Sequence, residues 1–126
     1  MQAAIAACHA RATTPAETDW PRIVALYDAL AQLAPSSVVE LNRAVAVGMA
    51  FGPAAGLELA DALVSEPTLR AYHLLPAVRG DLLRRLGRYN EARIEFERAA
   101  SLTENQPERD LLRRRAAECV AEQMSE

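Results

Sequence analysis

Apolar residues in this chain recur at intervals of three or four positions, the spacing that places side chains on one face of an α-helix. The pattern is clearest at Ile23, Leu26, Tyr27, Leu30 and Leu33. No segment alternates apolar and polar residues with a period of two, so we expect no β-strands. The pattern predicts about seven helices, over residues 2–12, 20–33, 38–51, around 57–63, 76–86, 90–102 and from 106 onward.

Residues that favour helix ends mark several of these boundaries. Asp19, Ser37 and Asn105 can each accept a hydrogen bond from a backbone N–H in the first turn of a helix. Pro76 can occupy the first turn of the fifth helix. Gly87 can end that helix, because glycine tolerates the left-handed backbone that often follows a last turn.

The apolar faces of the helices are the expected core. Trp20 and Tyr27 lie seven residues apart on one face, and we interpret them as core packing. The third helix offers Val38, Leu41, Val45 and Met49, and the last helix offers Leu111, Leu112, Ala116, Cys119 and Val120. Residues 68–75 are not assigned to an element, although their apolar side chains indicate partial burial.

One segment carries a repeat pattern. Residues 87–99 read Gly-x-Tyr-x-x-Ala-x-x-x-Phe-x-x-Ala, which matches the turn and second helix of a tetratricopeptide repeat. Small side chains at Ala92 and Ala99 let this helix approach its neighbour closely. Tyr89 and Phe96 fill the gaps between the two helices.

Two weaker copies of this spacing precede it, at Ile23, Tyr27 and Leu30 and again at Ala55, Leu59 and Ala62. Their central residues and Phe96 are 32 and 37 residues apart, which straddles the 34-residue period of the repeat. The sequence therefore predicts an all-α fold of tetratricopeptide-like stacked antiparallel helix pairs, with a C-terminal capping helix. The alternative is a generic helical bundle with accidental similarity.

Composition narrows the class of protein further. The 126 residues fit one domain, and the net charge is −3, whereas domains that hold nucleic acid usually carry a basic excess. We therefore expect no direct binding of DNA or RNA. Two cysteines without metal or redox spacing, and no long apolar run, indicate a cytoplasmic protein away from the membrane.

No motif for catalysis is present in the sequence. We find no phosphate-binding glycine loop, no zinc-protease motif and no Ser/His/Asp set, so we expect neither an enzyme, a metal nor a cofactor. His9 and His73 are the only histidines, and we interpret them as structural. His73 can orient the turn before Pro76 by hydrogen bonding.

Several strings along the chain resemble one family. They are Ala3–Ala10, Asp19–Trp20 with Leu26–Leu30, Leu-Asn-Arg-Ala-Val-Ala-Val at 41–47, Gly52–Leu57, Tyr-His-Leu-Leu-Pro-Ala at 72–77, and Asp81–Arg88. In this order they resemble the C-terminal, tetratricopeptide-like extension of a group of bacterial extracytoplasmic-function RNA polymerase sigma factors. The resemblance covers nearly all 126 residues. It implies that residues 1–126 form one domain of a longer sigma factor whose promoter-binding regions are absent here.

The resemblance also implies a role for the domain. In that family the extension is thought to modulate sigma activity through contacts with the sigma regions of the same chain or with RNA polymerase core. The second hypothesis is a free-standing tetratricopeptide adaptor or co-chaperone that holds peptide segments. Neither hypothesis requires this domain to touch promoter DNA.

Stacked helix pairs leave a groove lined by the first helix of each pair, and this groove is the candidate binding site. The register places Asn42, Arg43, Asp81, Arg84 and Arg85 there. The planar guanidinium of arginine suits a carboxylate, so an acidic or extended peptide is the expected ligand. The alternative for the arginines after Asp81 is a solvated helix end, and the same holds for the basic run at 113–115.

Overall fold

The computed structural model describes residues 18–124, and within them every regular element is helical. The elements are α2 (Trp20–Leu33), α3 (Ser37–Phe51), α4 (Pro53–Ala62), the short 3-10 helix η2 (Pro67–Leu69), α5 (Leu74–Arg85), α6 (Tyr89–Leu102) and α7 (Gln106–Met124). The all-α prediction is confirmed. The first predicted helix, at 2–12, lies outside the described residues.

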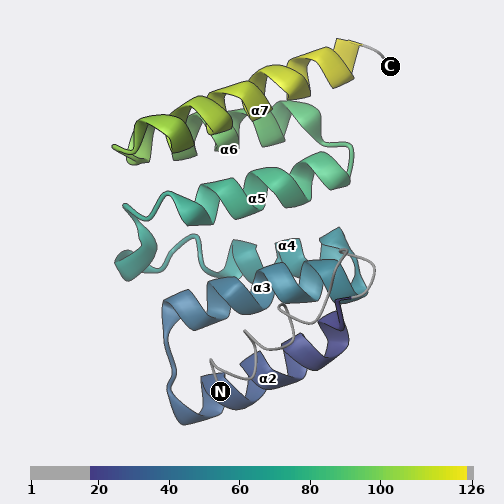
Figure 1. Ribbon diagram of the computed structural model, residues 1–126, viewed down its shortest axis with the longest axis vertical. Helices are drawn as coiled ribbons and strands as arrows, with labels where there is room; N and C mark the ends of the chain where they lie inside the picture. Colours follow the sequence, from purple (N-terminus) through teal and green to yellow (C-terminus); the bar gives the residue numbers. More distant parts are fainter. Residues whose placement is uncertain (1–17, 125–126) are drawn as a thin grey trace.

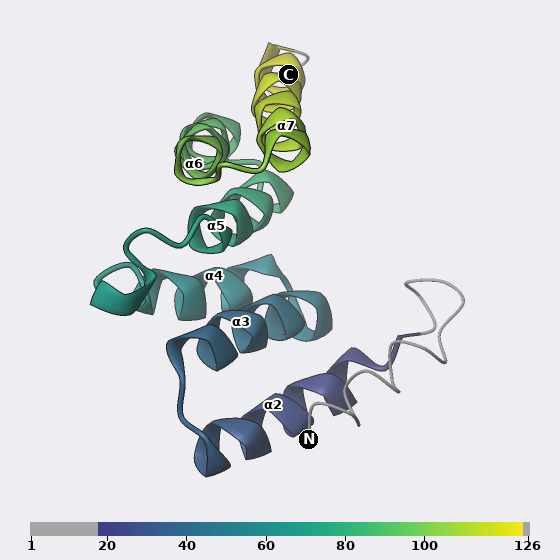
Figure 2. The ribbon, with the colours of Figure 1, turned by 60° about the vertical axis from the view of Figure 1, so that its left-hand side comes forward.

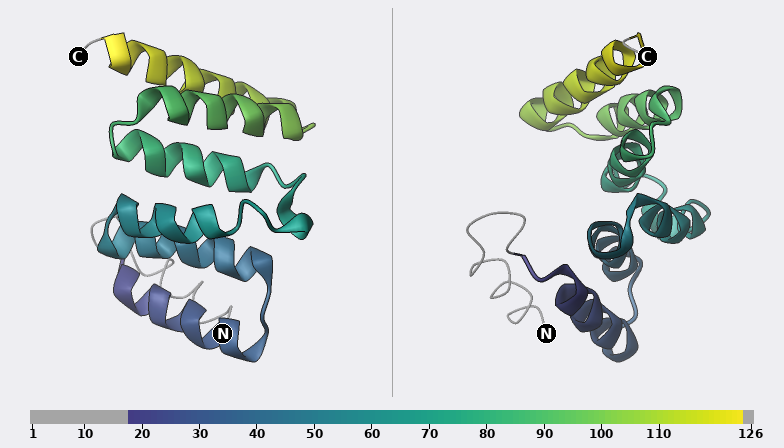
Figure 3. Two further views of the ribbon diagram at one scale, coloured as in Figure 1. Left: turned by 180° about the vertical axis from the view of Figure 1, so that it is seen from behind. Right: turned by 90° about the vertical axis from the view of Figure 1, so that its right-hand side faces the viewer.

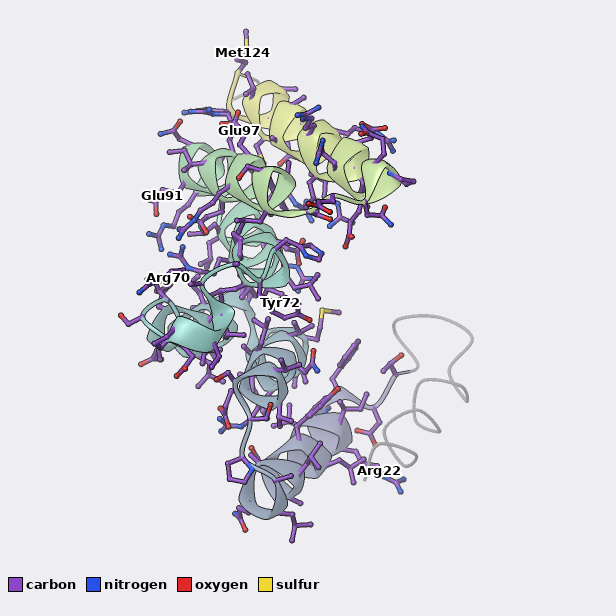
Figure 4. All side chains as sticks on the ribbon, turned by 90° about the vertical axis from the view of Figure 1, so that its left-hand side faces the viewer. Arg22, Arg70, Tyr72, Glu91, Glu97 and Met124 are labelled. Carbon is purple, nitrogen blue, oxygen red and sulfur yellow. The ribbon has the colours of Figure 1, made fainter. Side chains whose placement is uncertain are left out.

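The helices form a single stack in chain order (Figure 1). Each helix packs on the next and runs antiparallel to it, from α2 at one end to α7 at the other. The stack is curved, as the turned views show (Figures 2 and 3). With α3 and α5 in the middle, α4 and α6 lie toward one side and α2 and α7 toward the other (Figure 4).

Two of the three predicted helix caps are confirmed. The Asp19 carboxylate accepts a hydrogen bond from the Arg22 N–H at 3.2 Å, and the Asn105 side chain accepts one from the Glu108 N–H at 3.0 Å. The prediction for Ser37 is wrong by one residue, because the N-cap of α3 is Ser36, whose hydroxyl accepts from Val38 N–H.

The unassigned segment before α5 contains η2, and α5 then begins at Leu74, two residues earlier than Pro76. Pro76 still lies in the first turn of α5, where its missing N–H breaks no hydrogen bond of the helix. The turn after α5 is as predicted, since Gly87 has a left-handed backbone with φ of 78°. This conformation lets the Arg88 N–H reach back to the Leu83 carbonyl at 2.9 Å.

A large cluster of buried residues lies where α5, α6 and α7 meet. Phe96, Ala92 and Ala99 of the repeat motif are all fully buried there, as the spacing predicted. A Cβ atom on Gly80 of α5 would lie only 3.0 Å from the Phe96 ring, so the absence of a side chain lets the two helices close. Cys119 of α7 is also fully buried in this cluster.

The predicted register of α4 is wrong by one position. Ala62, the expected counterpart of Ala99, is exposed, whereas Gly56, Leu57 and Ala60 are buried. The cause is a backbone contact between α3 and α4, in which a Cβ on Gly56 would lie 2.8 Å from the Gly48 Cα. This contact decides which face of α4 turns inward.

Some predicted core residues are exposed instead. Val38 and Val45 of α3, and Leu111 and Val120 of α7, each keep more than a third of their surface in contact with solvent. Trp20 and Tyr27 do pack against the cluster of α2 and α3, as predicted. The remaining apolar residues on α3 and α7 are therefore available for other contacts.

A candidate protein-interaction groove

A hollow of about 240 Å³ lies between α3, α5 and α7, and we call it the groove. Its lining consists of Val45, Leu74, Ala77, Val78, Asp81, Leu82, Arg85 and Arg115. The middle of the lining is formed by α5, while Val45 and Arg115 close it from the neighbouring helices. Apolar and charged side chains therefore share one small concave surface, which is typical of binding sites.

Asp81 organises the charged part of the groove. Its carboxylate accepts a hydrogen bond from Arg84 Nη2 at 3.1 Å and forms an ion pair with Arg85 Nη2 at 3.0 Å. Arg85 Nη1 also lies 3.0 Å from the sulfur of Met49 on α3. Asp81 and Arg85 were predicted at this site, and the structure brings both into the lining.

Arg84 is outside the groove lining. Its hydrogen bond to Asp81 is the largest cause of a raised guanidinium pKa, and Glu122 and Cys119 of α7 contribute to the same shift. Arg84 therefore lies in the electrostatic environment between α5 and α7, and its side chain is about one-third exposed.

The other two predicted site residues, Asn42 and Arg43, are both outside the groove lining. Arg43 binds the Asp28 carboxylate of α2 and the Glu40 carboxylate, the latter at 3.2 Å. The hydrogen bond to Asp28 is the largest cause of the raised Arg43 pKa. Arg43 thus joins α2 to α3 and does not line the groove. Asn42 is half-buried, and it lies one turn before Val45 on α3.

The sequence analysis placed two of the eight lining residues at the site and missed the other six, of which Val45, Leu74 and Arg115 are the most exposed. Val45 was assigned to the core, Leu74 fell in the unassigned segment, and Arg115 was interpreted as part of a solvated basic run. Each is partly or largely exposed in the structure. For Val45 an available signal was the apolar run at 44–47 on α3, because neighbouring helices cannot cover every face of one helix.

His73, at the N-terminal end of α5, contacts α7 through its side chain. Its Nε2 atom lies 2.7 Å from Glu108 Oε1, and its ring meets the Tyr72 ring edge-on with centroids 5.9 Å apart. The predicted hydrogen-bonding role of His73 at this turn is therefore seen, with a partner on α7.

Other kinds of site are not apparent in the described part of the chain. Within residues 18–124, no group of three or more His, Cys, Asp or Glu side chains is placed to hold a metal ion. No helix described by the structure is long and apolar enough to cross a membrane.

Among known proteins, the chain has a relative that matches almost its whole length. The chain is 47% identical over 122 residues to an uncharacterized protein of Rhizobium meliloti (strain 1021). The match covers 97% of this chain but only 28% of that relative, so the chain spans less than a third of its length. No family model and no solved structure matches the chain.

Proposed function

We propose that this domain is a protein-interaction module that regulates an extracytoplasmic-function sigma factor in transcription initiation. It acts by holding a segment of the sigma regions, or of RNA polymerase core, in the groove between α3, α5 and α7. The observation that carries the interaction role is the combination in the groove of exposed apolar Val45 and Leu74 with the Asp81–Arg85 ion pair and Arg115.

The groove fits side chains of a partner protein that lies along the stack better than a whole metabolite. Its lining comes from three helices that do not follow one another directly in the sequence, so a ligand there would contact several elements at once. The apolar side chains of the lining can bury the partner's apolar residues, while its charged residues can set the partner's orientation. Arg115 has no acidic partner within hydrogen-bonding distance among the described residues, so it can pair with an acidic group of the partner.

The sigma-factor assignment rests on the resemblance of the Leu-Asn-Arg-Ala-Val-Ala-Val and Tyr-His-Leu-Leu-Pro-Ala strings. The Rhizobium relative supports it in one respect, because there the matched segment is a minor part of a longer protein. A domain joined to other regions is expected for a sigma-factor extension. A free-standing peptide-binding adaptor is the alternative proposal, and it uses the same groove.

Binding of the full 126-residue chain to purified sigma regions 2 and 4, and separately to polymerase core, tests the proposal. Calorimetry or a saturable pull-down gives the affinity. Val45→Glu places a charge on the apolar part of the groove at a position already 37% exposed, so we expect the fold to persist and affinity to fall about tenfold or more.

Val120→Glu is the matched control, because Val120 is similarly exposed at 40% but lies on α7 outside the groove. It should bind as the natural chain does. Equal losses in both variants would contradict a role of the groove. Binding to neither sigma regions nor polymerase core would contradict the sigma-factor assignment and favour the adaptor.

A further inference from the structure

A second hollow, of about 250 Å³, lies between η2, α5 and α6, and we call it the arginine pocket. Its charged lining is Arg70, Arg79, Glu95 and Arg98, and its apolar lining includes Leu69 and Leu75. Arg70 lies on the side of the stack where α4 and α6 are found, away from α7 (Figure 4). The pocket shares no lining residue with the groove.

Glu95 is the buried charge at the centre of this pocket, with only 7% of the residue exposed. Its Oε2 atom lies 2.9 Å from Arg79 Nη1, so the two side chains form an ion pair. The geometry of this pair does not meet the requirements of a hydrogen bond. Arg79 Nε in turn binds Asp61 of α4 at 3.0 Å. A buried carboxylate is costly unless it is paired, so Arg79 is committed to these two acids and is not available to a ligand.

Arg70 and Arg98 are left with free hydrogen-bonding capacity. Arg98 Nη1 lies 3.6 Å from Glu95 Oε1, which is too long for a hydrogen bond, and its side chain is 53% exposed. Arg70 is exposed and has no acidic partner among the described residues. Because each guanidinium carries five N–H donors and no acceptor, an anionic oxygen group is the ligand that would satisfy both.

The rest of the pocket is apolar and small. Leu69 and Leu75 are buried and face the hollow, and Val64 at its edge is 44% exposed. A hollow of this volume has room for the end of a peptide but not for a helix. The ligand must therefore carry an apolar group directly beside its anionic group.

We propose that the arginine pocket binds the C-terminal residue of a partner protein whose chain ends in an apolar amino acid. Arg70 and Arg98 hold the terminal carboxylate, and the side chain of the terminal residue packs on Leu69 and Leu75. Only at a chain end do a carboxylate and an apolar side chain share one residue, which matches a small hollow whose lining includes both arginines and both leucines. The proposal does not depend on the sigma-factor assignment or on the groove.

The test uses N-acetyl-leucine as a probe for a leucine-ended chain and N-acetyl-leucinamide as its uncharged match. Both are titrated into the isotope-labelled 126-residue chain, and NMR shift changes are followed. We expect N-acetyl-leucine to shift the methyl signals of Leu69 and Leu75 and the side-chain N–H of Arg98, saturating with a Kd of about 1–10 mM, as befits so small a ligand. The amide should bind at least about tenfold more weakly.

Arg70→Gln and Arg98→Gln should each weaken binding of N-acetyl-leucine about tenfold, whereas Arg114→Gln, an exposed arginine on α7, should have no effect. Equal shifts from the acid and the amide, or no saturable shift, would overturn the proposal. Equally strong binding of inorganic phosphate would make this a general anion site. Stronger binding of N-acetylglutamic acid α-amide would assign the pocket to an internal acidic side chain instead.

Discussion

Gly56 shows how a single residue sets the distance between two helices. A Cβ atom at this position would lie 2.8 Å from the Ala44 carbonyl oxygen and equally close to the Gly48 Cα, and both are backbone atoms that cannot turn aside. A Cβ on Gly48 would instead meet the end of the Leu82 side chain, which can change its rotamer. Gly48 and Gly56 lie at the same helix crossing, but a side chain can be accommodated more easily at Gly48 than at Gly56.

This difference gives a prediction for the paired substitutions Gly56→Ala and Gly48→Ala. In Gly56→Ala the helices must separate, and we expect the free energy of unfolding to fall by about 1–3 kcal/mol. In Gly48→Ala the gain of about 1 kcal/mol in helix propensity offsets the rearrangement of Leu82, so the net change should be small. Chemical denaturation measures both, and an equal loss in the two variants would contradict this account of the crossing.

At the scale of one element, the start of α3 depends on a residue that the sequence pattern placed one position too late. Ser36 and Ser37 are both reasonable N-caps by type, and only the backbone decides between them. Ser36 has the extended conformation of a cap, and its hydroxyl accepts from Val38 N–H at 3.2 Å. The Ser37 hydroxyl instead accepts a hydrogen bond from the hydroxyl of Thr68, the middle residue of η2.

We therefore expect Ser36→Ala to destabilise the domain by about 1 kcal/mol, the usual cost of losing a helix cap. Ser37→Ala removes an exposed side-chain hydrogen bond between α3 and η2 and should cost less than half as much. Thermal or denaturant unfolding of the two variants provides the comparison. A larger loss of stability in Ser37→Ala than in Ser36→Ala would contradict the role of Ser36 as the N-cap of α3.

At the scale of the whole molecule, each helix among residues 18–124 packs mainly on its neighbours in the chain, with few contacts beyond them. The end helix α7 is therefore packed on one side only, and it holds Cys119 buried against α5 and α6. Burial is the main cause of a raised pKa for the Cys119 thiol, and Glu122 adds to it. Both effects lower the fraction of reactive thiolate while α7 stays in place.

The packing of α7 gives a prediction for thiol labelling in a Cys8→Ser background. Cys119 should react with a disulfide reagent at pH 8 about 100-fold more slowly than an exposed cysteine at position 120. The exposed cysteine is introduced by Val120→Cys in a protein that also carries Cys119→Ser. Because the pKa of Cys119 is raised, its reaction should still be accelerating at a pH where the exposed thiol has levelled off. Equal rates would mean that α7 opens freely from the stack.

Much of this architecture follows from the sequence alone. The helical period, the caps at Asp19 and Asn105, the turn at Gly87 and the buried Ala92, Phe96 and Ala99 depend on local geometry and on residue size, so spacing predicts them. Among the candidate site residues, Asp81 and Arg85 both line the groove, since they lie one turn apart on one face of α5.

The tertiary structure alone decided which apolar faces find a partner. A helix in an open stack has neighbours on two sides at most, so the apolar residues Val45 and Leu74 remain exposed and form the groove with Arg115 from another helix. It also decided which charges pair. Arg43 forms an ion pair with Asp28 on α2, and Glu95 forms ion pairs with arginines of α5 and α6. The contacts of Arg43 with Asp28 and of Arg79 with Glu95 join residues 15 or more positions apart, and periodicity carries no information about them.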